Sequence, residues 1–72
     1  MPTETFFNLP SEKRQLITEI AIEAFADNEY SDVSISRIVA RAGIAKGSFY
    51  QYFADKEDLH GYLLDLIAEK KR

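Results

Sequence analysis

The stretch that decides the fold runs from Ser34 to Ala54 and reads SISRIVARAGIAKGSFYQYFA. It contains none of the twelve acidic residues of the chain. Because it holds Arg37, Arg41 and Lys46, it is a +3 segment in a chain of net charge −3. Two short helical patterns lie in it, one on each side of a glycine. Cations, hydroxyls and aromatic edges on a short helix behind a tight turn suit the DNA major groove. The stretch therefore predicts sequence-specific DNA binding.

The first helix of this stretch is expected at about 35–42. Its apolar residues repeat on one helical face and are Ile35, Ile38, Val39 and Ala42. Ser34 precedes them and is expected to cap the helix, because its hydroxyl can accept from amides of the first turn. Gly43 supplies the positive φ that a sharp turn between helices needs. Ile44 is expected to reach the core at that turn.

The second helix is expected at about 45–52, so that the two form a helix-turn-helix unit. In such a unit the second helix enters the major groove and the first crosses the phosphate backbone. Phe49 and Phe53 stand at i and i+4 and are expected to face the core. A rotation of 100° per residue then directs the opposite face outward, and this face carries Lys46, Gly47, Tyr50 and Gln51.

The DNA contacts predicted on the second helix are Lys46, Gly47, Ser48, Tyr50, Gln51 and Tyr52. Lys46 is expected at a guanine edge or a phosphate. Gln51 can pair with adenine through two hydrogen bonds, or pair less selectively. The hydroxyls of Ser48, Tyr50 and Tyr52 are expected at phosphate oxygens, with the Tyr50 ring also against a thymine methyl. Gly47 lets the backbone approach the phosphates closely.

Further phosphate contacts are predicted outside the second helix. Ser34 and the neighbouring amides make an anion site at the start of the first helix. Ser36 and Arg37 are also candidate DNA contacts, and we expect Arg37 and Arg41 to act as positioning charges, because they lie on the helix outside the groove. Lys56 is expected to hold another phosphate.

The whole chain is predicted to consist of an N-terminal arm at 1–9, a three-helix domain at 10–54 and a fourth helix at 55–72. The arm contains Phe6, Phe7 and Leu9 without a sustained period, and its phenylalanines are expected to pack on the domain or a partner. A helix is predicted at about 11–27, begun by Pro10 with Ser11 as a cap. We expect Asn28 or Glu29 to end it in the left-handed conformation.

The fourth helix is predicted to begin with a near capping box of Asp55 and Asp58 and to end in the basic residues 70–72. No strand pattern competes with these helices, so the predicted fold class is all-α. The domain is a small, homeodomain-like bundle of three helices plus the start of a fourth. Ile22 and Leu64 lie off the main apolar stripes and are expected to face a partner surface.

Composition excludes several classes of protein. A hydrophobic content of 46% with 29% charged residues is ordinary for a globular domain. With no cysteine and one histidine, we expect no disulfide, no metal site and no cofactor. No nucleophile–base pair or glycine-rich phosphate loop is present, so an enzyme is not expected. Without a signal peptide or a membrane-length apolar run, a cytoplasmic protein is predicted.

The run IVARAGIAKGSFYQYFADKEDL at 38–59 resembles the TetR/AcrR family of bacterial transcriptional regulators. The matching elements are the turn ending in AG, then KGSFYQYF, then a short loop and KEDL, and the resemblance covers about residues 12–65. It implies a DNA-binding domain that contacts a palindromic operator through Ser34, Lys46, Gly47, Ser48, Tyr50, Gln51, Tyr52 and Lys56. It also implies a ligand-responsive repressor that forms a homodimer and binds a small-molecule inducer through a C-terminal domain. We expect this chain to stop before that domain.

The sequence departs from the family pattern at three places. Glu29 stands where the family usually has glycine, which predicts a strained or differently shaped helix end. Ala45 stands where serine or threonine often caps the second helix, so a hydroxyl worth about 1 kcal/mol is missing. Ser36 and Arg37 replace a basic residue followed by an acidic one. The alternative to DNA binding is a small helical protein-interaction module that uses Ile22 and Leu64.

Overall fold

The structure is a computed structural model that describes residues 2–70. Its elements are α1 (Glu4–Phe7), α2 (Ser11–Asp27), the 3-10 turn η1 (Tyr30–Asp32), α3 (Ile35–Ala42), α4 (Lys46–Tyr52) and α5 (Lys56–Lys70). No strand occurs between residues 2 and 70, which confirms the all-α prediction. The bounds of α2 and α3 are those predicted, and α4 begins one residue later than expected. Residues 71 and 72 of the predicted basic helix end lie outside the described part.

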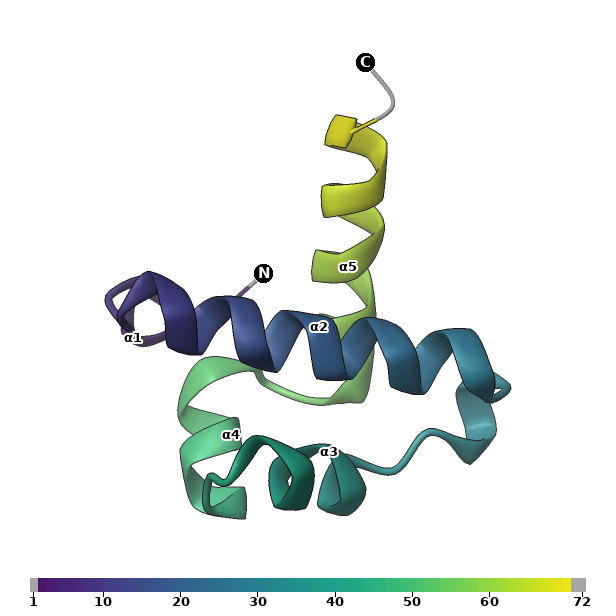
Figure 1. Ribbon diagram of the computed structural model, residues 1–72, viewed down its shortest axis with the longest axis horizontal. Coiled ribbons are helices and arrows are strands. Elements are labelled where there is room, and N and C mark those ends of the chain that lie inside the picture. Colours follow the sequence, from purple (N-terminus) through teal and green to yellow (C-terminus); the bar gives the residue numbers. More distant parts are fainter. Residues whose placement is uncertain (1, 71–72) are drawn as a thin grey trace.

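The long helix α2 lies across the middle of the molecule (Figure 1). On one side of it α3 and α4 form the helix-turn-helix unit, and α5 rises away on the other side. Helix α2 packs on both α3 and α5, while α1 packs on α4. This arrangement places α3 and α4 together at one face of the domain.

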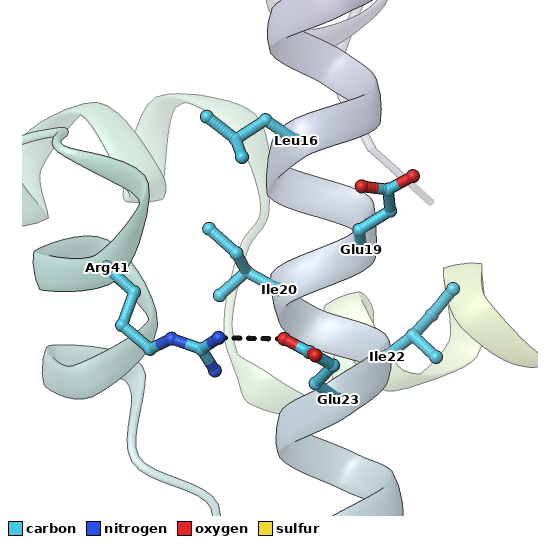
Figure 2. Close-up of a pocket in the computed structure, with 6 residues that line it drawn as sticks. All are labelled: Leu16, Glu19, Ile20, Ile22, Glu23 and Arg41. Atoms are coloured by element: carbon cyan, nitrogen blue, oxygen red, sulfur yellow. Dashed lines mark hydrogen bonds and ion pairs between the residues drawn. The ribbon is translucent and has the colours of Figure 1, made fainter.

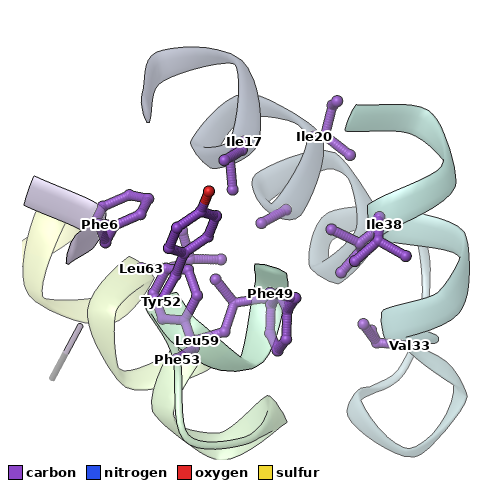
Figure 3. Close-up of a cluster of buried hydrophobic side chains, with 12 residues drawn as sticks. Phe6, Ile17, Ile20, Val33, Ile38, Phe49, Tyr52, Phe53, Leu59 and Leu63 are labelled. Carbon is purple, nitrogen blue, oxygen red and sulfur yellow. The ribbon is translucent and has the colours of Figure 1, made fainter. Parts of the chain in front are cut away.

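The core is built from all five α-helices (Figure 3). Its fully buried large side chains are Phe6, Ile17, Ile38, Phe49, Phe53 and Leu59. Phe49 of α4 and Phe53, which follows its last residue, both face inward, as their i, i+4 spacing predicted. Ile44 is half-buried and packs against the core at the turn, as expected. Burial of aromatic rings supplies much of the apolar area that a domain of this size needs.

The segment at 1–9 was predicted to be an arm without a sustained period, whose phenylalanines pack on the domain or a partner. The packing of Phe6 on the domain is confirmed, whereas a helix in this segment was not predicted. Residues 4–7 form the helix α1, and Phe6 is completely buried. Its ring lies 4.9 Å from that of Phe53 and 5.4 Å from that of Tyr62, measured between centroids. A four-residue helix is too short to show a period in the sequence, so only tertiary packing reveals it.

The prediction that a residue in the left-handed conformation ends α2 is wrong. Asn28 is extended at φ −138°, Glu29 has φ −69°, and no residue between 2 and 70 other than glycine has a positive φ. Instead the Asn28 side-chain amide donates to the Ala24 carbonyl at 3.0 Å. The glutamate at the family's glycine position is therefore unstrained. At the other end, Pro10 and not Ser11 holds the cap position, and no side-chain cap bond forms.

The helix caps predicted further along the chain are confirmed. The Asp58 amide donates to Asp55 Oδ1 at 2.8 Å, and the Ala54 amide donates to Asp58 Oδ2 at 2.9 Å. Desolvation acts to raise the pKa of Asp58, but hydrogen bonds, including that from the Ala54 amide, act together with a nearby positive charge to lower that pKa. The first bond is that of an N-cap, and the second ties Asp58 to the residue before the cap, so together they fix the loop between α4 and α5.

Two apolar side chains were expected to face outward, and both do. Ile22 is 39% exposed and Leu64 is 52% exposed.

Among residues 2–70, no helix has both the length and the hydropathy that crossing a membrane requires. Nor do the described residues bring together three or more metal-ligating side chains.

Candidate nucleic-acid interface

The turn between α3 and α4 is made by Gly43, which has φ +71°. The Gly43 amide donates to the Ala40 carbonyl at 3.3 Å, and the Ile44 amide donates to the Val39 carbonyl at 3.1 Å. These bonds satisfy carbonyls that the end of α3 would otherwise leave unpaired. The sharp turn holds α4 at a fixed angle to α3, as a helix-turn-helix requires.

Helix α4 has one buried and one open face. Phe49 is fully buried, whereas the opposite face exposes Lys46, Gly47, Tyr50 and Gln51, as predicted. Tyr50 is 49% exposed and stands edge-on to the Phe49 ring, with 5.2 Å between centroids. Ser48 is half-buried beside this face. The open face therefore presents a cation, a phenol and an amide on a single short helix.

The start of α3 lies next to the start of α4 through a side-chain contact. Lys46 Nζ donates to Ser36 Oγ at 3.1 Å. The sequence placed both residues among the candidate contacts but did not predict their hydrogen bond. The bond brings the Lys46 ammonium to the first turn of α3, and a lysine with three N–H donors keeps others for an anion.

Ser34 caps α3 as predicted, because its Oγ accepts from the Arg37 amide at 3.3 Å. Ser34 is half-buried, while Ser36 and Arg37 are exposed. The first-turn amides of α3 and the positive end of its dipole face the same region as the Lys46 ammonium. The structure thus groups Ser34, Ser36, Arg37 and Lys46 at adjacent helix starts.

Arg41 is bound to α2 by a salt bridge (Figure 2). Its Nη2 lies 2.7 Å from Glu23 Oε2, with both side chains more than half exposed. An exposed pair of this kind contributes little stability, about 0–1 kcal/mol, but it neutralises one of the three cations of the 34–54 stretch. Arg37 and Lys46 remain as the positive charges of the α3–α4 face.

Two residues that were predicted to contact DNA, Tyr52 and Lys56, interact with other parts of the domain. Tyr52 is only 6% exposed and packs in the core with its ring centroid 6.1 Å from that of Phe6. Helical rotation explains this position, because residue 52 follows the buried residue 49 by three and therefore shares its face. Tyr52 thus contributes to the core, and the phosphate contact predicted for its hydroxyl receives no support from its burial.

Lys56 also makes bonds within the domain that were not predicted. Its Nζ donates to the carbonyls of Tyr30 at 2.9 Å and Val33 at 3.1 Å, and lies 4.7 Å from the centre of the Tyr30 ring. Partial burial, followed by the nearby charges of Glu57 and Asp55, raises the pKa of the Tyr30 phenol. These contacts of Lys56 hold η1 against the start of α5, and the phosphate contact expected for Lys56 stays a prediction.

One contributor to the site was missed by sequence reasoning. Thr3 donates from its hydroxyl to the Gln51 carbonyl at 2.6 Å and from its amide to the Tyr52 carbonyl at 2.9 Å. These atoms belong to the end of α4, and the Gln51 carbonyl lies 48 residues further along the chain. A single threonine near the N-terminus carries no local pattern that predicts such a bond.

The geometry is that of a helix-turn-helix whose second helix has an open face. The sequence of this chain is similar to those of known proteins. The profile described as bacterial regulatory proteins of the tetR family matches residues 17–63. The chain belongs to the tetR family. It is 40% identical over 58 residues to the fatty acid metabolism regulator protein of Bacillus subtilis (strain 168), covering 81% of this chain and 28% of that protein. The matched residues thus include both helices of the helix-turn-helix unit, α3 and α4.

Two further relatives agree with this membership. An HTH-type transcriptional regulator of Staphylococcus aureus (strain USA300) is 40% identical over 53 residues, which cover 74% of this chain and 29% of the regulator. The crystal structure of a TetR family transcriptional regulator from Chloroflexus aurantiacus J-10-FL is 62% identical, with a TM-score of 0.94. That match covers 99% of this chain and 33% of the solved chain. The chain therefore spans about a third, or less, of each relative.

Proposed function

We propose that this chain is the DNA-reading part of a tetR-family transcriptional regulator, with α4 in the major groove. The observation that carries the proposal is the division of α4 into two faces. One face is locked into the core through Phe49, and the other exposes Lys46, Tyr50 and Gln51. Because the buried face fixes the helix, the exposed side chains are held in a constant orientation.

Within this proposal, Gln51 and Tyr50 read base edges and the Tyr50 ring meets a thymine methyl. Gly47 lets the α4 backbone approach the phosphates, and a Cβ built there meets nothing within 4 Å in the free protein. Ser48 donates its hydroxyl to a phosphate. Ser34, Ser36 and Arg37 position α3 on the backbone, and Lys46 binds a phosphate or guanine edge beside them.

The proposal extends to the whole regulator. Helix α5 leads toward a C-terminal domain that binds a small-molecule inducer and joins two copies, which together read a palindromic operator in the cytoplasm as a repressor. Two half-sites engaged together raise the affinity far above that of one. The three relatives named above support this view, because all are described as regulators and all are much longer than this chain.

The test measures the affinity of the chain for duplex DNA, recovered by selection from randomised sequences, as a function of salt. With two or three phosphates contacted, the logarithm of the affinity should fall with the logarithm of salt at a slope of roughly −2 to −3. Lys46→Ala should reduce this slope by about one. Lys13→Ala, which removes an exposed cation from α2 instead, should leave it unchanged.

The alternative, a protein-interaction module that uses Ile22 and Leu64, predicts a different outcome. It requires binding that hardly changes with salt and no enrichment of any DNA sequence. A selection that enriches nothing, together with equal slopes for Lys46→Ala and Lys13→Ala, would overturn the DNA-reading proposal.

A further inference from the structure

The N-terminal segment makes the contacts that end the reading helix. Helix α4 has only seven residues, and a helix of that length does not hold its own shape in water. Its N-terminal cap position is Ala45, which makes no side-chain bond. The helix must therefore be held by groups from elsewhere in the chain.

At its C-terminal end, α4 is held by Thr3. The Thr3 hydroxyl donates to the Gln51 carbonyl at 2.6 Å, and the Thr3 amide donates to the Tyr52 carbonyl at 2.9 Å. Such terminal carbonyls have no partner inside their own helix. The side chain of Gln51 is exposed, so the residue whose carbonyl Thr3 binds is one that faces outward.

Three residues after Thr3, the buried Phe6 fixes the same end of α4 from the core side. Its ring centroid lies 4.9 Å from that of Phe53 and 6.1 Å from that of Tyr52. Figure 3 shows the Phe6 ring directed toward Tyr52. Helix α1 is thus anchored beside α4, and the two lie at the same end of the molecule (Figure 1).

We propose that Thr3 is a positioning residue for DNA reading: its two hydrogen bonds hold the end of α4, and with it Gln51, in the orientation that the groove requires. This inference rests on the proposed function. It assigns a role in recognition to a segment that does not itself touch DNA in this account. Without these bonds the last turn of α4 opens more often, and the affinity for the correct sequence falls more than that for unrelated DNA.

The test uses a graded series at position 3 in the full 72-residue chain. Thr3→Ser keeps both donors. Thr3→Val keeps the shape and loses the hydroxyl. Thr3→Pro loses both donors at a φ of −80°, which proline can adopt. Asn28→Ala is the matched control, because it removes another side-chain bond to a helix-end carbonyl, that of Ala24 in α2.

The first measurement is hydrogen exchange in the free protein and needs no DNA. The Phe53 amide, which donates to the Phe49 carbonyl at 2.9 Å, should exchange roughly fivefold faster in Thr3→Val and more than that in Thr3→Pro. Thr3→Ser should match the natural chain. The Ile38 amide in α3 should keep its rate in all of them. Equal rates at Phe53, or an equal acceleration at Ile38, overturn the proposal.

The second measurement is the ratio of affinities for a duplex recovered by selection and a scrambled duplex of the same composition, below the melting temperature of every variant. The ratio should fall roughly fivefold in Thr3→Pro and stay constant in Thr3→Ser and Asn28→Ala. An unchanged ratio in Thr3→Pro overturns the role in reading. If the natural chain itself shows no preference, the proposed function fails, while the exchange rates still decide whether Thr3 holds α4.

Discussion

The two helices of the reading unit are held in different ways. Both ends of helix α3 are set by residues next to it in the sequence, since Ser34 caps its start and Gly43 turns the chain at its end. Helix α4 has no capping side chain at its start, and its end is bonded by Thr3 from the far end of the sequence. The helix proposed to position the protein on DNA is thus specified by its sequence neighbours, whereas the helix proposed to read bases depends on tertiary contacts.

This difference separates stability from recognition. Ser34, which caps the start of α3, is also proposed to face a phosphate, so changing it alters both the helix and its anion site. The groups that hold α4 lie behind it and leave its open face free for Lys46, Tyr50 and Gln51. Substitutions behind α4 therefore test its support without removing a DNA contact.

The largest effect is expected from Phe6→Ala, which removes the completely buried ring behind α4. Its free energy of unfolding should fall by about 3–5 kcal/mol, which is a large part of the total stability of a small domain. Urea denaturation measures the loss. Phe7→Ala removes the neighbouring ring, which is 43% exposed, and should cost much less. Similar costs for both variants would show that α1 is not anchored as described.

A smaller effect is expected at the end of α3. Gly43→Ala forces an L-residue into φ +71° and should destabilise the domain by about 1–2 kcal/mol in thermal denaturation. Gly47→Ala in the first turn of α4 should instead stabilise it by about 0.5–1 kcal/mol, because no such φ is needed there. The same Cβ at position 47 should weaken DNA binding. Changes of the same sign at both glycines would contradict the assignment of the turn.

The smallest effects compare the two helix starts. Ser34→Ala should cost about 1 kcal/mol, because it removes the acceptor of the Arg37 amide. Ala45→Ser should add a cap that α4 lacks and stabilise the domain by up to about 1 kcal/mol. Melting temperatures of the two variants should move in opposite directions. A loss of stability in Ala45→Ser would mean that the start of α4 does not accept a capping hydroxyl.

Much of this fold could be predicted from the sequence, because most of its signals are local. The apolar spacing gave the bounds of α2 and α3, and serine and glycine at the expected places gave both ends of α3. Phe49 and Phe53 fixed which face of α4 is buried. These features depend on residues within a few positions of one another, so a single sequence is enough to read them.

The sequence did not predict features that distant residues decide. Helix α1 exists because Phe6 enters a core formed by α4 and α5, and no local period announces that. Lys56 was expected at a phosphate, and that contact stays a prediction, but the sequence did not show that carbonyls of Tyr30 and Val33, more than twenty residues away, also bind its ammonium. Tyr52 was expected to contact a phosphate through its hydroxyl, which stays a prediction, and its spacing from Phe49 by three also places its ring on the buried face.

The open face of α4 is the part of the molecule that we propose reads DNA. The most direct test is the affinity of Tyr50→Ala for a duplex recovered by selection, measured beside the natural chain and Phe7→Ala at temperatures where all three are folded. Tyr50 is 49% exposed, so its removal should leave the fold intact. We expect the affinity to fall roughly tenfold or more for Tyr50→Ala and to change little for Phe7→Ala. Natural affinity in Tyr50→Ala would contradict the proposal.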